Sequence, residues 1–118
     1  MSHNSESGPM TENTQLIRGI LEGCILALVR KKESYGYWIV EKLRESGFSD
    51  IQESTVYPIL NRLEKRGLFI GRRKPSKLGP PRKYYSISSK GLAELERFTK
   101  IWKIIKNNVD IILREELN

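Results

Sequence analysis

The residues best suited to chemistry lie between positions 53 and 67, and they offer hydrogen bonds rather than reactive groups. An apolar stripe recurs there at steps of three and four residues, as in a helix, and comprises Val56, Ile59, Leu60 and Leu63. Off that stripe, the outward-facing residues are Ser54, Thr55, Tyr57, Pro58, Asn61 and Arg62. Such residues near the N-terminal end of a helix can contact base edges in the DNA major groove. We therefore interpret this stretch as a DNA-recognition helix.

Two signals place the ends of this helix. Gly67 readily adopts the left-handed conformation that terminates helices. Pro58 has no backbone N–H and is best tolerated in a first turn, so the N-cap should be Ser54 or Thr55. Taken alone, the stretch could equally be an amphipathic helix whose polar face is merely solvated.

A second stretch, between Gly71 and Tyr85, combines many basic residues with no acidic one. Its cations are Arg72, Arg73, Lys74, Lys77, Arg82 and Lys83. Proline and glycine interrupt its middle and β-prone residues flank it, so we predict that Phe69–Lys74 and Arg82–Ile87 pair as a hairpin with a flexible tip. Like charges repel one another, so this hairpin is suited to bind an anion such as the DNA phosphate backbone. A solvated loop is the alternative.

Two earlier helices should position these residues. Apolar residues at every fourth position predict a first helix from Gln15 to Lys32, and a second should span Tyr35 to Ser46, capped by Glu33 and Ser34. Tyr35, at the start of the second helix, is included among the DNA contacts. Gly19 and Gly23 could allow a close crossing in the first helix or could simply be tolerated there.

These elements give a mostly α fold of the α+β class, a winged helix-turn-helix over residues 14–88. Residues 1–13 are rich in Ser, Asn and Gly and should form a disordered leader.

Residues 89–118 form a C-terminal dimerisation helix in this interpretation. It should run from about Lys90 to Glu115 after a cap at Ser88 and Ser89, a length of about 40 Å that so small a domain cannot cover. A heptad seam with steps of three and four comprises Leu95, Phe98, Trp102, Ile105, Val109 and Ile112. We expect this seam to lie against a second copy of the chain, which predicts a homodimer.

Composition narrows the function classes. The chain of 118 residues has a formal charge of +7 and a pI near 9.7, which favours polyanionic partners, nucleic acid or anionic membrane. We expect no membrane partner, because no apolar run could span a bilayer and the last helix mixes Lys with acids. The single cysteine, Cys24, fits a reducing cytoplasm. No spacing of catalytic or metal-ligating residues stands out, so we predict no enzyme, metal or cofactor.

Several motifs resemble the PadR-type transcriptional regulators. They are Leu16–Glu22, Ser34–Tyr37, Ser54–Leu68, Pro81–Tyr85 and Ile87–Gly91, in the order in which that family carries them. The resemblance covers about Leu16 to Val109. One departure is Ser88, where the family usually has threonine, and either residue can cap a helix.

The resemblance implies a bacterial cytoplasmic repressor of the small subfamily, dimeric through a single C-terminal helix. Some small members respond to aromatic or multidrug-like compounds between their subunits, where an aromatic residue of the last helix lines the cavity. Trp102 falls at the matching position, and we add Leu21 and Phe98 as further effector contacts. The alternative is that Trp102 and Phe98 simply fill the dimer core.

Two functions follow from these observations. The first is a sequence-specific, double-stranded-DNA-binding regulator that reads a pseudo-palindromic operator as a homodimer and is released by an aromatic effector. The second is a winged-helix module that binds nucleic acid without reading sequence and has no effector. The dimer seam and the polar face of the recognition helix favour the first.

Overall fold

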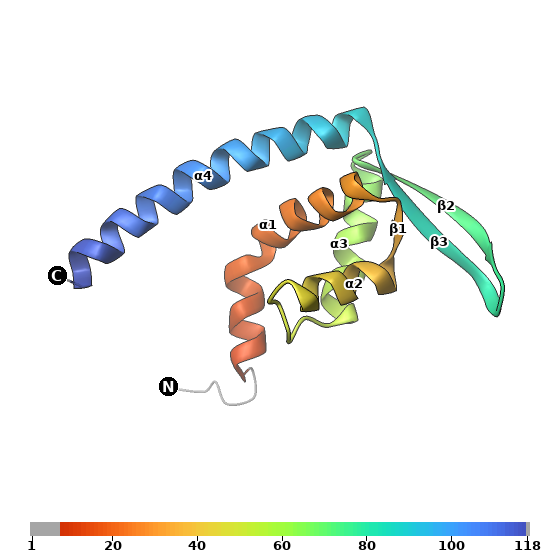
Figure 1. The fold of residues 1–118 in the computed structure, drawn as a ribbon, viewed down its shortest axis with the longest axis horizontal. Helices are drawn as coiled ribbons and strands as arrows, with labels where there is room; N and C mark the ends of the chain where they lie inside the picture. The colour runs from red at the N-terminus through yellow and green to blue at the C-terminus, as the bar shows by residue number, and fades with distance from the viewer. Residues whose placement is uncertain (1–7, 118) are drawn as a thin grey trace.

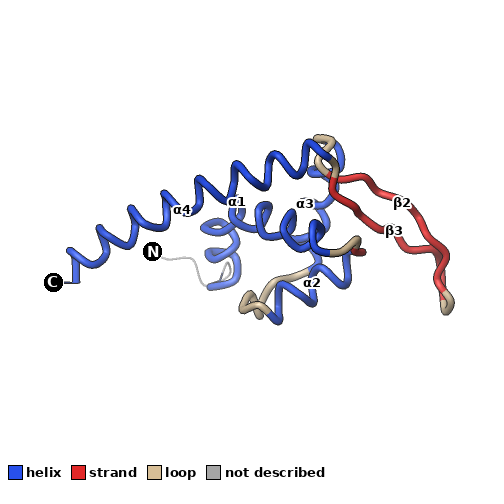
Figure 2. The backbone as a smooth tube through the Cα atoms, turned by 45° about the horizontal axis from the view of Figure 1, so that its top comes forward, coloured by secondary structure: helices blue, strands red, loops and turns tan. Residues whose placement is uncertain are grey.

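The computed structural model describes the backbone of residues 8–117 and the side chains of residues 17–115. Its elements are α1 (Gly8–Lys31), β1 (Ser34–Tyr35), α2 (Gly36–Glu45), α3 (Glu53–Lys65), β2 (Phe69–Ser76), β3 (Gly79–Ile87) and α4 (Ser89–Leu117). The first three helices form a compact body from which the β2–β3 hairpin projects, while α4 extends away from the hairpin (Figure 1). The tube view shows the same divergence of hairpin and α4 (Figure 2). The predicted winged helix-turn-helix is confirmed.

The sheet is antiparallel with strand order β1-β3-β2. The hairpin is longer than predicted: its strands pair from Phe69 opposite Ile87 to Ser76 opposite Gly79, which leaves a two-residue turn at the tip. Prolines fit this hairpin because β2 is an edge strand and β1 covers only the Tyr84–Tyr85 end of β3. The short strand β1 was not predicted, because two residues are too few to show an alternating pattern.

Burial of apolar stripes holds the body together. The stripes of the three helices meet in one core, as the periodicity predicts, and the residues that form it include Leu21, Ile25, Val29, Ile39, Val40, Leu43, Val56, Ile59, Leu60 and Leu63. Leu95, expected in the dimer seam, is instead 8% exposed within the core of its own chain. The first part of α4 therefore belongs to the winged-helix body.

The predicted stop at Gly67 is confirmed. Its φ of +78° is left-handed, its N–H donates to the Glu64 carbonyl at 2.9 Å, and the Leu68 N–H donates to the Leu63 carbonyl at 2.9 Å. This pair of bonds is a Schellman motif, which satisfies carbonyls that the helix end would otherwise leave open. It also fixes the direction in which the chain leaves α3 to begin the hairpin.

The predicted caps have different outcomes. Ser88 caps α4, since its hydroxyl oxygen accepts from the Gly91 N–H at 3.0 Å. The prediction that Ser54 or Thr55 caps α3 is wrong: the N-cap is Gln52, which makes no side-chain capping bond. Ser34 likewise caps nothing, because it lies in β1 and pairs with β3. Helix α3 instead begins where the Thr55 and Val56 N–H groups donate to the Gln52 carbonyl, and α2 begins directly after β1.

Because α3 begins at Glu53, Pro58 lies in its second turn rather than its first. The missing N–H leaves the Ser54 carbonyl without its usual helical partner. Helix α1 also begins earlier than expected, at Gly8 rather than Gln15. Pro9 suits that start, because a proline in a first turn forfeits no helical hydrogen bond. The expected disordered leader thus overlaps α1 at residues 8–13, and its residues 1–7 lie outside the described part of the chain.

Helices α1 and α4 cross closely at Gly23. A Cβ atom at Gly23 would overlap the Phe98 ring, whereas one at Gly19 would meet nothing within 4 Å. The close crossing suggested by these two glycines is therefore real at Gly23, while Gly19 is merely tolerated.

Gly23→Ala should lower the free energy of unfolding by about 1–3 kcal/mol, because the methyl group must displace Phe98 or separate the helices. Gly19→Ala is the matched control, since it adds the same methyl group in open space and should raise stability by up to about 1 kcal/mol. Urea denaturation at one fixed protein concentration measures both. Equal effects of the two substitutions would contradict the crossing.

Candidate nucleic-acid interface

The outward face of α3 carries the predicted base-reading residues. Ser54, Pro58 and Asn61 are exposed along one line of the helix, and Lys65 continues that line. Thr55 is half-buried beside them. Hydroxyl, amide and ammonium groups on one helical face can donate to and accept from base edges and phosphates.

Tyr57 joins this face to the start of α2. A Cβ atom at Gly36 would overlap the Tyr57 ring, so the ring lies directly on the backbone of a buried glycine. Burial, with a smaller contribution from the negative charge of Glu53, raises the pKa of Tyr57. Its hydroxyl therefore stays protonated at neutral pH and can donate a hydrogen bond. The residue as a whole remains 40% exposed and available to a ligand.

A hollow of about 390 Å³ brings α3, the start of α2 and the hairpin together. Its lining residues are Tyr35, Gly36, Tyr37, Tyr57, Arg82, Lys83 and Tyr85. Four of these, Tyr35, Tyr57, Arg82 and Lys83, were predicted DNA contacts, and they come from three elements, β1, α3 and β3. The Arg82 guanidinium carbon lies 4.5 Å from the centroid of the Tyr35 ring, which steadies the cation at the mouth of the hollow. An aromatic and basic concavity of this kind suits a phosphate or sugar.

A second, smaller hollow of about 230 Å³ flanks α3 on the side of α1. Its lining residues are Arg18, Ser54, Thr55, Pro58, Ile59 and Arg62. Arg18 was not predicted, although it could have been suspected as a cation off the apolar stripe of α1. Only the fold brings it beside the recognition helix.

The cations of the hairpin divide into two groups. Lys74 pairs with Glu33 at 2.6 Å, and Lys83 pairs with Glu64 at 2.7 Å. The hydrogen bond to Glu64 is also the main cause that raises the pKa of Lys83. The hairpin contains no acidic residue, but neighbouring parts of the chain supply two, Glu33 and Glu64. Within residues 17–115, the hairpin cations that carry no ion pair are Arg72, Arg73, Lys77 and Arg82.

Aromatic rings support the cations on one face of the hairpin. Arg72 lies opposite Tyr84, and Lys74 lies opposite Arg82, so these four share a face. The Lys74 Nζ is 5.1 Å from the Tyr84 ring centroid, and the Tyr84 ring meets Tyr35 edge to face at 5.2 Å between centroids. Tyr84 is a further supporting residue that sequence reasoning missed, because its role depends on the unpredicted strand β1.

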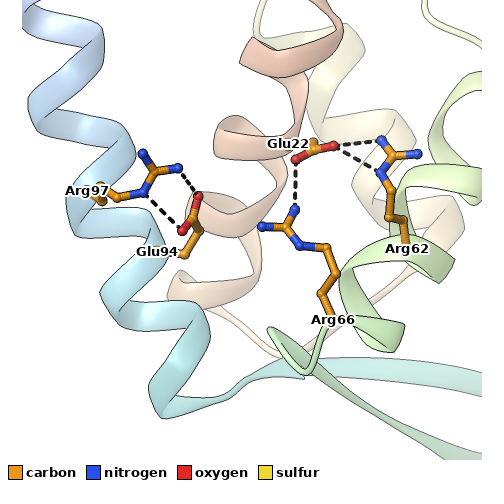
Figure 3. Close-up of polar contacts among 5 residues, drawn as sticks. All are labelled: Glu22, Arg62, Arg66, Glu94 and Arg97. Atoms are coloured by element: carbon orange, nitrogen blue, oxygen red, sulfur yellow. Dashed lines mark hydrogen bonds and ion pairs between the residues drawn. The ribbon is translucent and has the colours of Figure 1, made fainter.

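Arg62, predicted to contact DNA, is already engaged within the chain. It and Arg66 both donate to Glu22 of α1 (Figure 3). Of the acids that organise the basic surface, Glu22, Glu33 and Glu64 were all missed. Each is far in sequence from its cation, or lies across an element boundary, so no local spacing reveals the pair.

The three residues predicted to bind an effector, Leu21, Phe98 and Trp102, do not all line one site. Between α1 and α4 lies an apolar groove of about 680 Å³, whose lining includes Phe98 and Trp102 together with Ile17, Ile20, Ile101, Ile105 and Val109. Leu21 is fully buried in the core and does not line this groove. Ile105, Val109 and Ile112 of the predicted seam are exposed along the outer half of α4.

Known proteins show the same organisation. Residues 25–97 match the family described as the transcriptional regulator PadR-like family. This chain belongs to the PadR-like family of transcriptional regulators. A PadR-like regulator from Bacillus cereus is 43% identical, with a TM-score of 0.75 over 84% of this chain and 96% of that one. A PadR family regulator from Eggerthella lenta is 31% identical, with a TM-score of 0.77 over 87% and 89%. A curated protein of Lysinibacillus sphaericus is 34% identical over 102 residues, 85% of this chain and 94% of that protein.

Membership of the PadR-like family makes this chain a DNA-binding regulator of transcription rather than an enzyme. Two structural findings accompany that assignment. No helix in the described part is long and apolar enough to cross a membrane. Among the same residues, no three His, Cys, Asp or Glu side chains cluster so as to hold a metal ion.

Gly36→Ala should move the Tyr57 ring and lower the free energy of unfolding by about 1–3 kcal/mol through overpacking. In a Tyr57→Ala background the same glycine substitution should cost much less, because the overlapping ring is gone. Chemical denaturation of the four proteins in this cycle gives the coupling between the two positions. Additive effects would contradict the contact.

Proposed function

We propose that this PadR-like protein is a sequence-specific repressor that acts in the cytoplasm and binds a pseudo-palindromic operator as a homodimer. The observation that carries the proposal is the hollow shared by α3, α2 and the hairpin. Through Tyr57 it places the recognition helix beside Arg82 and Lys83 of the hairpin, which is the wing of this fold. In this arrangement α3 enters the major groove, and Arg72, Arg73 and Arg82 contact flanking phosphates.

The outer half of α4 supports the homodimer. Its exposed apolar residues include Ile104, Ile105, Val109, Ile111, Ile112 and Leu113. Exposed apolar surface on this scale is typical of a protein–protein interface rather than of a solvated helix. A second α4 packed along it would cover the seam and present two recognition helices about one helical turn of DNA apart.

The apolar groove beside this seam supports a small-molecule effector in the same proposal. Trp102 and Phe98 give it flat, apolar walls suited to a planar aromatic compound. A second subunit would close the groove into a cavity. Occupation of that cavity would then alter the spacing of the two recognition helices and release the operator.

Fluorescence anisotropy with the DNA upstream of the protein's own gene tests the proposal, in excess unrelated DNA and at near-physiological salt. We expect saturation at two protomers per site and loss of binding on addition of a planar aromatic compound. Binding that the unrelated DNA abolishes would instead favour a winged-helix module that does not read sequence.

Replacing Arg72 and Arg73 by alanine should weaken binding to every duplex and flatten the salt dependence of log K by about 2, since each lost phosphate contact removes about 0.9. Lys100→Ala with Lys103→Ala is the matched control, because it removes the same charge from exposed positions on α4. The readout is the slope of a salt titration. An unchanged slope in the variant that lacks Arg72 and Arg73 would contradict a contact between the wing and DNA.

Ile105→Glu with Ile112→Glu should convert the dimer to a monomer, because four carboxylates would face one another in the seam. Lys103→Glu with Asn107→Glu places two acids on the opposite face of α4 and should leave the dimer intact. Analytical ultracentrifugation distinguishes the two outcomes. A wild-type protein that sediments as a monomer at micromolar concentration would contradict the homodimer.

A further inference from the structure

Glu22 of α1 pairs with two arginines at once (Figure 3). Arg62 lies in the recognition helix α3, and Arg66 is the C-cap of that helix. Its Oε2 accepts hydrogen bonds from Arg62 Nε at 3.1 Å and from Arg62 Nη2 at 2.6 Å. Its Oε1 accepts from Arg66 Nη1 at 3.4 Å. Two cations therefore share one anion, which leaves the cluster with a net charge of one positive unit.

Arg62 is placed where a DNA backbone could reach it. Its side chain is 44% exposed and lines the hollow that also contains Ser54, Thr55 and Pro58 of the recognition helix. A guanidinium offers the same fork of N–H donors to a carboxylate and to a phosphate. Glu22 therefore takes the position on Arg62 that a DNA phosphate could otherwise occupy.

We propose that Glu22 determines specificity by withholding Arg62 and Arg66 from the phosphates of unrelated DNA. Non-specific binding depends almost entirely on phosphate contacts. Pairing of the arginines with Glu22 therefore weakens non-specific binding more than it weakens binding to the operator. An operator that fits the base-reading face of α3 holds its phosphates in register long enough to exchange with Glu22. The exchange is feasible because exposed ion pairs contribute little to stability.

The proposal rests on the DNA-binding function proposed above and adds a role that function does not require. Glu22 acts through the two arginines and need not touch DNA. A purely structural Glu22, which only ties α3 to α1, would predict the opposite response: its loss would weaken operator binding and leave the salt dependence unchanged. The two roles can therefore be separated by measurement.

The test is Glu22→Gln, which keeps the side-chain shape and removes the charge. Affinities for the operator and for an unrelated duplex are measured across a salt series. We expect non-specific affinity to rise about three- to tenfold and its salt slope to steepen by about 1–2, since each released arginine adds about 0.9 per phosphate contact. Operator affinity should change less, so the ratio of specific to non-specific affinity falls.

Glu94→Gln is the matched control. Glu94 forms a bidentate pair with Arg97 on α4, and its side chain is 24% exposed, the same as that of Glu22 (Figure 3). The substitution removes the same unit of charge but breaks hydrogen bonds to Arg97 and none to Arg62 or Arg66, so the affinity ratio should stay near that of the wild type. Adding Arg62→Gln and Arg66→Gln to Glu22→Gln should also abolish the steepened slope.

Three results would overturn the inference: an unchanged affinity ratio in Glu22→Gln, an equal effect of Glu94→Gln, or weakened operator binding with an unchanged slope. Circular dichroism and urea denaturation of each variant exclude an unfolded protein as the cause. A wild-type protein that fails to bind any duplex would instead refute the proposed function. The two failures are thus distinguishable from the same titrations.

Discussion

The crossing of α1 and α4 at Gly23 is the constraint on which the rest of the structure depends. Because Gly23 has no side chain, the Phe98 ring lies on the backbone of α1 and fixes the course of α4. Leu95, one turn earlier, is thereby drawn into the core, while the outer half of α4 leaves the body with its apolar seam exposed. The same crossing forms one end of the apolar groove lined by Phe98 and Trp102.

Helix α1 connects helix α4 to the part of the molecule that carries the recognition helix. It contacts α4 as well as α2, α3 and β3. Adjacent residues of α1 face different partners, since Gly23 lies under Phe98 of α4 while Glu22 pairs with arginines on the α3 side. A movement of α4 relative to α1 would therefore be felt next to the recognition helix. This gives a physical route by which an occupied groove could influence DNA binding.

Acidic side chains determine which cations of the basic surface are free of ion pairs. Glu33 and Glu64 each neutralise one cation of the wing, and Glu22 engages two arginines beside the recognition helix. A net charge of +7 thus overstates the number of cations ready to meet a phosphate. Within the hairpin, the cations that carry no ion pair to a described residue are Arg72, Arg73, Lys77 and Arg82.

The sequence by itself determined the order of the elements, the core stripes, the stop at Gly67 and the cap at Ser88, because each depends on local periodicity or on a neighbouring residue. Only the tertiary structure decided the strand β1, the burial of Leu95 within its own chain, and the partners of Arg62. These features arise from contacts between residues distant in the chain. Their energies leave no periodic trace in the sequence, so they appear only once the helices and the hairpin are placed together.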